Sequence, residues 1–198
     1  MSSLCRIVPF SHSYLAEVLQ AGDTAIDLTA GNGHDTLFLS QCVGKEGRVF
    51  SFDLQEQALH NTEQRLKGVG FNCSCHKIPF AEPAAGVYLI NASHDLLAQY
   101  INQPVSAIIA NLGYLPGGDR QIVTNPDTTI SALQQSLQLL KVSGRLAVVI
   151  YPSHPEGIAE IEVLNRFFAN LDPLSWDALN LQILNRPDSP RLLVAEKK

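Results

Sequence analysis

A strand that runs into a glycine turn and then directly into a helix most restricts how this chain can fold. Thr24–Thr29 (TAIDLT) is an apolar run of strand length, Gly31-Asn32-Gly33 forms the turn, and His34–Gln41 has the spacing of an amphipathic helix. The same alternation recurs along the chain. It is typical of an α/β fold in which helices cover both faces of a parallel sheet and ligands bind at the carboxyl ends of the strands.

The complete pattern predicts a Rossmann-like α/β fold with a doubly wound, mostly parallel seven-stranded sheet. A length of 198 residues without repeats or a linker favours a single domain over residues 1–198. Two consecutive terminal strands predict a C-terminal antiparallel hairpin, and residues 68–85 are compatible with an extra strand and a loop. The predicted strands are Thr24–Thr29, Arg48–Asp53, Gly86–Ile90, Val105–Ala110, Gly144–Tyr151, Trp176–Leu184 and Leu192–Glu196, and the predicted helices are His34–Gln41, Gln55–Lys67, Asp95–Ile101, Thr128–Leu140 and Glu156–Leu171.

Polar residues around the glycine turn predict a nucleoside-containing cofactor. A helix N-terminus directs free N–H groups at a ligand, and Asp53, about twenty residues beyond the turn, can accept hydrogen bonds from both ribose hydroxyls. Dinucleotide folds use G-x-G-x-x-G, but Thr36 takes the place of the third glycine. Asp27 and Asp35 suit a ligand with a cationic amino group. We therefore favour S-adenosylmethionine over NAD, with a turn that only reverses the chain as the remaining alternative.

A second motif, Asn111-Leu112-Gly113-Tyr114, directly follows the fourth predicted strand. Methyltransferases that act on exocyclic amines often carry Asn or Asp, two prolines and an aromatic residue here, so that the amide and a backbone carbonyl accept hydrogen bonds from the target nitrogen. Leu112 and Gly113 replace both prolines, which makes the match partial. The alternative for Asn111 is a side chain that only caps the turn.

Further polar residues lie on loops at the same predicted edge of the sheet. Asp119 follows a glycine-rich stretch, and His154 follows the fifth strand, where a structural role is the alternative. Ser93 and His94 follow the third strand, a usual place for adenine contacts. His12 belongs to no motif, and we interpret it as structural or as part of a lid.

The composition excludes several classes of protein. A net charge of −5 and a pI near 5.6 argue against coating nucleic acid by bulk charge, although a local basic patch remains compatible. The sequence has no apolar run of about 20 residues and no signal-peptide pattern, which predicts a cytoplasmic protein without a membrane span. Cys73 and Cys75 form only C-x-C, so we predict no metal site.

The segments DLTAGNGHDTLFLS, FDLQ, ANLGYLPGGDR, TTISAL and YPSHPEG, in this order, resemble a bacterial family long labelled rRNA methylases. Members are now understood as tRNA 5-aminomethyl-2-thiouridine methyltransferases, and the resemblance extends from Phe10 to Lys197. It implies a class I fold that depends on S-adenosylmethionine and methylates the aminomethyl nitrogen of the wobble uridine, with the tRNA anticodon loop as partner. The chain departs from the family at Ser153, where glycine is usual, and at Arg186, where glutamine is usual.

Motifs and resemblance together assign residues to two roles. A small-molecule methyltransferase and an NAD-dependent oxidoreductase remain the alternative functions, and the oligomeric state stays open, with a homodimer as one alternative. The predicted catalytic residues are Asn111, Tyr114, Asp119 and His154. The predicted cofactor-binding residues are Asp27, Thr29, Gly31, Asn32, Gly33, His34, Asp35, Thr36, Asp53, Gln55, Ser93, His94, Asn111 and Leu112.

Overall fold

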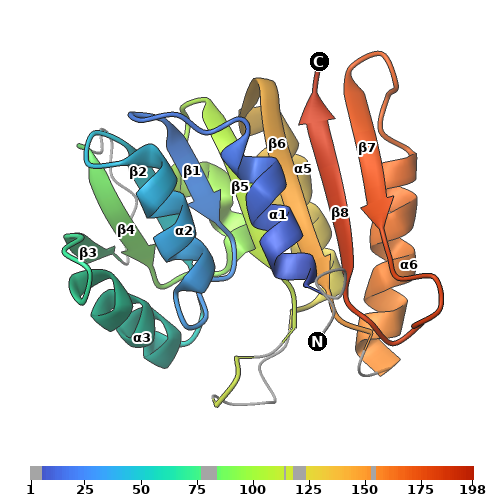
Figure 1. Cartoon of the computed structure of the whole chain (residues 1–198), viewed down its shortest axis with the longest axis horizontal. Helices are drawn as coiled ribbons and strands as arrows, with labels where there is room; N and C mark the ends of the chain where they lie inside the picture. Colours follow the sequence, from blue (N-terminus) through green and yellow to red (C-terminus); the bar gives the residue numbers. More distant parts are fainter. Residues whose placement is uncertain (1–5, 77–83, 114, 118–123, 153–154) are drawn as a thin grey trace.

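One mixed sheet with helices on both faces forms the framework of the protein (Figure 1). The structure, a computed structural model, describes residues 6–76, 84–113, 115–117, 124–152 and 155–198. The strands are β1 (Thr24–Asp27), β2 (Arg48–Phe52), β3 (Cys73–His76), β4 (Gly86–Ile90), β5 (Val105–Asn111), β6 (Leu140–Ile150), β7 (Trp176–Leu181) and β8 (Arg191–Lys197). The helices are α1 (Ile7–Ala16), α2 (His34–Val43), α3 (Glu56–Lys67), α4 (Leu97–Tyr100), α5 (Pro126–Leu139) and α6 (Pro155–Ala169), with a 3₁₀ turn η2 (His94–Leu96) before α4.

The strand order is β3-β4-β2-β1-β5-β6-β8-β7, and neighbouring strands are parallel except where β8 lies antiparallel between β6 and β7. The doubly wound sheet and the C-terminal antiparallel hairpin are therefore confirmed. Because β1 lies between β2 and β5, the chain crosses the sheet after β4 to continue on the other side of β1. Such a switch point opens a crevice at the carboxyl ends of the strands, where ligands bind in this class of fold.

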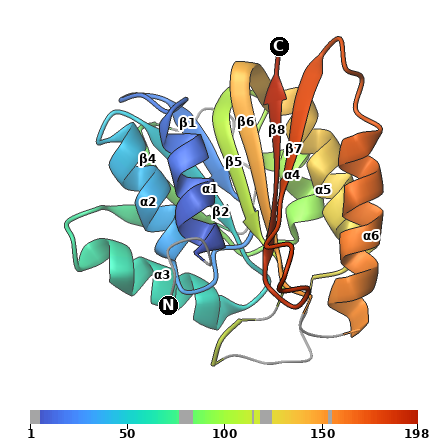
Figure 2. The same ribbon diagram turned by 45° about the vertical axis from the view of Figure 1, so that its right-hand side comes forward.

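Alternating side chains along the central strands divide the core into two layers. In β1, Ile26 packs into one cluster with residues of α4, α5 and α6, whereas Ala25 packs into the other with residues of α1, α2 and α3. Figure 2 shows these two groups of helices on opposite sides of the sheet. All four residues of β1 are buried, as expected for a parallel strand covered on both faces.

The prediction of seven strands is wrong by one, because the described residues contain eight. The additional strand is β3, which pairs in parallel with β4 at the edge of the sheet. It has only four residues, and Ser74 and Cys75 are exposed. A short, polar edge strand carries no apolar periodicity, so the sequence offered only the suggestion of an extra strand within residues 68–85.

The sequence analysis did not predict helix α1. Pro9 falls in its first turn, where the backbone N–H groups have no partner within the helix, so proline is tolerated there. Ile7 and Leu15 are buried against the sheet. Tertiary packing, rather than a strong amphipathic pattern, therefore holds this helix in place.

Ser143-Gly144, a turn signal between the predicted helix Thr128–Leu140 and the predicted strand Gly144–Tyr151, lies inside β6. Helix α5 ends at Leu139 and β6 begins at once, with a shift in its register against β5. Ser143 has a positive φ of 63° at this irregularity. The local turn signal was real, but the strand continues through it as a bulge because pairing with β5 begins again beyond the extra residues.

Candidate functional site

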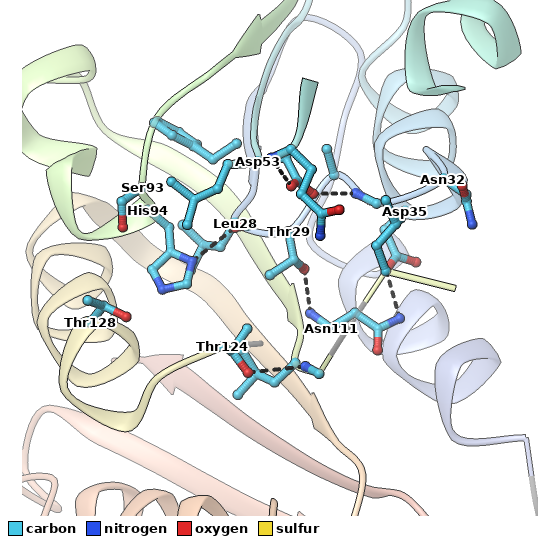
Figure 3. A pocket seen from close by; sticks show the side chains of 18 of the residues that line it. Leu28, Thr29, Asn32, Asp35, Asp53, Ser93, His94, Asn111, Thr124 and Thr128 are labelled. Atoms are coloured by element: carbon cyan, nitrogen blue, oxygen red, sulfur yellow. Dashed lines mark hydrogen bonds between the residues drawn. The ribbon is translucent and has the colours of Figure 1, made fainter. Parts of the chain in front are cut away.

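A cavity of about 490 Å³ opens at the carboxyl ends of β1, β2, β4 and β5 (Figure 3). Its size falls within the range of small-molecule sites, and it lies at the switch point of the sheet. Its walls come from the loops that follow these four strands and from the start of α5. The lining residues are Leu28, Thr29, Ala30, Gly31, Asn32, His34, Asp35, Phe52, Asp53, Leu54, Gln55, Ala92, Ser93, His94, Asn111, Leu112, Gly113, Leu115, Pro116, Thr124, Asn125, Thr128 and Tyr151.

The glycine turn is held from outside the cavity by helix α3. Gly31 and Gly33 have positive φ values of 53° and 77°. The Thr62 hydroxyl donates to the Gly31 carbonyl oxygen at 3.2 Å, and Arg65 Nε donates to the Asn32 carbonyl oxygen at 2.6 Å. With its backbone fixed in this way, the turn is preorganised before any ligand arrives.

Asp27 supports the turn from behind and does not line the cavity. Its side chain is buried, and it accepts hydrogen bonds from the Thr29 backbone N–H at 3.0 Å and from the Thr36 hydroxyl at 2.6 Å. Burial and the neighbouring Asp35 raise the pKa of Asp27 to about 7. Asp27, Gly33 and Thr36, which we predicted as cofactor contacts, therefore shape the turn and are not among the residues of the cavity wall.

Asp53 lies directly on the cavity wall, as predicted for a ribose-binding carboxylate. One of its oxygens accepts the Gly31 N–H at 3.0 Å, and the other accepts the Gln55 N–H at 2.9 Å. Burial raises the pKa of Asp53. Each carboxylate oxygen can accept a second hydrogen bond, so the group is fixed by the backbone and can still accept from two hydroxyls.

His94 carries a buried acceptor atom that the protein itself leaves unused. Its Nδ1 lies 3.2 Å from the Leu28 carbonyl oxygen, so the proton of the neutral ring is on Nδ1. Burial lowers the pKa of His94, which keeps the ring neutral near pH 7. Its Nε2 is buried and has no hydrogen-bond partner among the described residues. Such an atom on a cavity wall indicates a ligand that donates a hydrogen bond there.

The side chain of Asn111 lies between two polar neighbours on the cavity wall. Its Nδ2 donates to Asp35 Oδ2 at 3.3 Å, and its backbone N–H donates to the Thr29 hydroxyl at 2.8 Å (Figure 3). Tyr151 is hydrogen-bonded to the Asn111 side chain, and burial followed by Asp35 raises the pKa of the Tyr151 phenol. Asp35 also contacts His12, at 2.6 Å between Oδ1 and Nε2.

Thr124 joins Gly113, which follows Asn111 closely, to helix α6. Thr124 and Gly113 exchange two hydrogen bonds, from the Gly113 N–H to the Thr124 hydroxyl at 3.1 Å and from the Thr124 N–H to the Gly113 carbonyl at 3.2 Å. The Thr124 hydroxyl donates in turn to Glu160 Oε2 at 3.3 Å, and Glu160 is buried. Gly113 and Thr124 are thereby tied to α6.

The structure brings most of the predicted cofactor residues to the cavity and leaves several predicted catalytic residues undescribed. Tyr114, Asp119 and His154 lie outside the described residues. Predicted cofactor residues on the wall are Thr29, Gly31, Asn32, His34, Asp35, Asp53, Gln55, Ser93, His94, Asn111 and Leu112.

Sequence reasoning missed His12, Thr124, Asn125, Thr128 and Tyr151 as residues in or beside the cavity. The signal for the α5 residues was present, because Asn125 precedes proline at the start of the helix and accepts the Asp127 N–H at 2.8 Å, as an N-cap does. No local signal could have found His12, whose partner Asp35 is remote in sequence.

The described residues show neither a metal cluster nor a membrane span. They contain no group of three or more His, Cys, Asp or Glu side chains placed to hold a metal ion. No described helix is long and apolar enough to cross a membrane. Cys42, Cys73 and Cys75 are free thiols, and burial, then Glu63, raises the pKa of Cys73 to about 11, so its thiol is protonated near pH 7.

Comparisons with known proteins place the chain among methyltransferases. The family model for putative rRNA methylases matches residues 49–197, and a model for protein-L-isoaspartate(D-aspartate) O-methyltransferases matches residues 1–84. The chain is 36% identical over 196 residues to the chloroplastic tRNA (mnm(5)s(2)U34)-methyltransferase of Arabidopsis thaliana, covering 95% of this chain and 68% of the plant protein.

Solved structures with the same architecture include a putative rRNA methylase from Clostridium thermocellum, with a TM-score of 0.87, 36% identity, and coverage of 96% of this chain and 97% of that one. A putative methyltransferase from Streptococcus mutans, solved in complex with SAH, has a TM-score of 0.81 and 33% identity over 96% and 97% of the two chains. The fold is therefore that of the class I methyltransferases, and the chain belongs to the family of putative rRNA methylases.

Proposed function

We propose that this methyltransferase transfers the methyl group of S-adenosylmethionine to the aminomethyl nitrogen of 5-aminomethyl(-2-thio)uridine at the wobble position of tRNA. The observation that carries the proposal is the likeness of nearly the whole chain to the plant tRNA (mnm(5)s(2)U34)-methyltransferase, whose name contains the methylated form of this nucleoside. Membership of a methyltransferase family removes the oxidoreductase alternative. The cytoplasmic location stays a prediction, since the plant relative is chloroplastic.

The residues of the cavity fit S-adenosylmethionine. Asp53 would accept hydrogen bonds from the ribose hydroxyls, and the unpartnered Nε2 of His94 would accept one from a donor of the nucleoside. The preorganised turn around Gly31 would lie along the methionine part. When bound, the cofactor supplies a methyl group activated by a sulfonium centre.

The residues around Asn111 fit an amine acceptor. Because Asp35 can only accept hydrogen bonds when ionised, the amide nitrogen of Asn111 faces Asp35. The amide oxygen Oδ1 has two lone pairs, so beside the hydrogen bond between Tyr151 and this side chain it can accept from an N–H group of the substrate. This hydrogen bond would align the acceptor nitrogen with the methyl group at near-attack distance, about 3–3.5 Å.

An aliphatic amine is mostly protonated near neutral pH and must lose a proton before its lone pair can attack. Of the catalytic residues predicted from the sequence, Asp119 and His154 are the candidates for the proton acceptor. Both lie outside the described residues, so this assignment stays a prediction. The anticodon loop would present its base unpaired, so that it could enter the cavity without opening a duplex.

One experiment tests the proposed function directly. Bulk tRNA that carries 5-aminomethyl-2-thiouridine is incubated with the protein and S-adenosylmethionine, and the nucleosides are analysed by mass spectrometry. We expect the aminomethyl nucleoside to gain one methyl group, with no gain for an Asn111→Ala variant. An unchanged nucleoside profile would exclude this substrate.

A small-molecule acceptor is the second candidate, because the net charge of −5 gives the protein no overall attraction to RNA. The free nucleoside serves as the competing substrate in the same assay. Transfer to tRNA that is much faster and falls steeply with added salt would support RNA recognition through phosphate contacts. Equal rates with the free nucleoside would support the small-molecule alternative.

The Asp53→Ala variant tests the cofactor half of the site. We expect its affinity for S-adenosylhomocysteine to fall by about 1.5–3 kcal/mol, the usual contribution of hydrogen bonds to a charged group, as measured by calorimetry. Asp172→Ala is the matched control, because Asp172 accepts the N–H of Leu174 two residues on, as Asp53 accepts that of Gln55, but lies away from the cavity. Wild-type affinity in a folded Asp53→Ala variant would contradict the placement of the ribose.

A further inference from the structure

The N-terminal helix places a side chain against Asp35, a residue of the cavity wall, and the proposed function does not yet use it. His12, on α1, stacks against Phe38 of α2 with ring centroids 3.9 Å apart and an interplanar angle of 3°. Its Nε2 lies 2.6 Å from Asp35 Oδ1. The His12 side chain is 24% exposed and that of Asp35 is 5% exposed, so the carboxylate is nearly enclosed and the imidazole covers it.

Two hydrogen bonds converge on the Asp35 carboxylate. A carboxylate only accepts, so His12 Nε2 carries a proton and donates to Oδ1, while the Asn111 amide donates to Oδ2. Asp35 is thus held between two donors on opposite oxygens. The second of these donors is the Asn111 side chain, which we place against the acceptor nitrogen. The position of the Asn111 amide therefore depends on that of the Asp35 carboxylate.

Helix α1 is itself fixed, which gives His12 a defined place. The guanidinium of Arg145 on β6 donates to the Tyr14 carbonyl oxygen and to Glu17 Oε2, each at 2.6 Å. Its Nε donates to Glu196 Oε2 on β8 at 2.6 Å. The helix that carries His12 is therefore anchored to the far half of the sheet, and the imidazole approaches α2 from a rigid support.

We propose that His12 is a positioning residue for methyl transfer: it holds Asp35, and through Asp35 it sets the orientation of the Asn111 amide, so that Oδ1 faces the acceptor nitrogen. The inference rests on the proposed function for the identity of the acceptor. The hydrogen-bonded chain from His12 to Asn111 does not depend on which amine is methylated. Misplacement of an aligning group by about 1 Å can cost about 100-fold in rate, so a residue remote from the chemistry can have a large effect.

Two substitutions at His12 separate positioning from helix docking and from proton transfer. His12→Phe keeps a ring to stack on Phe38 but removes the hydrogen-bond donor, whereas His12→Gln places an amide N–H near the position of Nε2 but cannot relay a proton. We expect kcat to fall by about 10- to 100-fold in His12→Phe and to return to within about threefold of wild type in His12→Gln. Affinity for S-adenosylhomocysteine should stay within about twofold in both, because neither change touches the cofactor half of the site.

His60→Phe is the matched control, because His60 also lies on a helix and contacts a neighbouring side chain, Gln64 at 2.8 Å, but is not on the cavity wall. It should leave kcat unchanged. Wild-type turnover in His12→Phe would overturn the proposal, and so would a His12→Gln variant as slow as His12→Phe, which would indicate that the imidazole transfers a proton.

Nitrogen NMR provides a readout without substrate or cofactor. The wild-type protein should show a protonated His12 Nε2 in a hydrogen bond, and the side-chain NH₂ resonances of Asn111 should shift in His12→Phe but not in His60→Phe. An unprotonated Nε2 in the wild type would overturn the inference. So would Asn111 side-chain resonances that stay unchanged when His12 is replaced. If His12→Phe fails to fold, His12→Gln serves as the second variant. A wild-type protein that leaves aminomethyl-uridine tRNA unchanged would reject the proposed function, whereas the NMR result would still decide the role of His12.

Discussion

Gly33→Ala is expected to destabilise the protein by about 3–4 kcal/mol and to weaken S-adenosylhomocysteine binding by at least about tenfold. Gly33 has a φ of 77°, which an L-residue adopts only with strain. A Cβ atom there would lie 2.7 Å from Thr62 Cα and 2.9 Å from Thr62 Oγ1. Because the first of these atoms is backbone, helix α3 would have to move, and with it the hydrogen bond from Thr62 to Gly31 that holds the turn.

Gly22→Ala is the matched control for this prediction. Gly22 has a similar φ of 89°, but an added Cβ would meet nothing within 4 Å. It should therefore cost only the backbone strain, about 1–2 kcal/mol, and leave cofactor binding unchanged. Urea unfolding and calorimetry on both variants measure the difference, and equal losses in the two would show that the contact with α3 is unimportant.

Asp27→Asn is expected to remove a pH dependence of stability that spans about 3 kcal/mol between pH 4 and pH 7. In the folded protein, burial and then Asp35 raise the pKa of Asp27 to about 7, above its ordinary value of 3.8. Between these pH values the folded chain binds the proton more tightly than the unfolded chain. The free energy of unfolding therefore falls as the pH rises, by at most about 1.4 kcal/mol per pH unit, and levels off above pH 7.

The asparagine can keep the local hydrogen bonds. Its oxygen would still accept the Thr29 N–H, and its amide nitrogen would donate to the Thr36 hydroxyl, which lies 2.7 Å from Ser51 Oγ and can donate to it. Wild type should therefore lose stability relative to this variant from pH 4 to pH 7 in urea titrations.

Asp23→Asn provides the contrast. Burial acts to raise the pKa of Asp23, but hydrogen bonds from Gln20 and Lys141 outweigh it and leave the pKa lowered. The stability that ionised Asp23 contributes is therefore lost only as the pH falls through the acidic range. The difference between wild type and this variant should stay level from pH 5 to pH 7. If the free energies of unfolding of wild type and Asp27→Asn changed in parallel from pH 5 to pH 7, Asp27 would be ionised in the folded protein over that whole range.

The elements that could be predicted from the sequence are those whose burial leaves a local pattern. β1 and β5 are covered on both faces and appear as short, mostly apolar segments, so that they form strands was predictable. β3 and α1 were not, because one is a short polar edge strand and the other depends on tertiary contacts. The shift inside β6 was also hidden, since Ser143 looks like the end of an element when only its neighbours are considered.

The residues of the candidate site also differ in whether a local sequence pattern reveals them. Asp53 and the glycine turn could be assigned to one candidate site because cofactor recognition in this fold uses residues at fixed spacing along one strand–turn–helix–strand unit. His12 contacts Asp35, and Tyr151 is hydrogen-bonded to Asn111. In each pair the two residues lie far apart in the sequence, so no spacing rule connects them. Three-dimensional contact alone also distinguishes Asp27, which supports the turn from behind, from Asp53, which lines the cavity.

The anchoring of α1 by Arg145 makes the geometry around Asp35 depend on strands that lie far from it in the sequence. Arg145 belongs to β6, and its guanidinium is held in turn by Glu196 of β8, which pairs with β6. Local opening of β8 would therefore loosen the support of His12 while the glycine turn and Asp53 stay in place. Under the proposed role of His12, such partial unfolding would slow methyl transfer before it weakens cofactor binding.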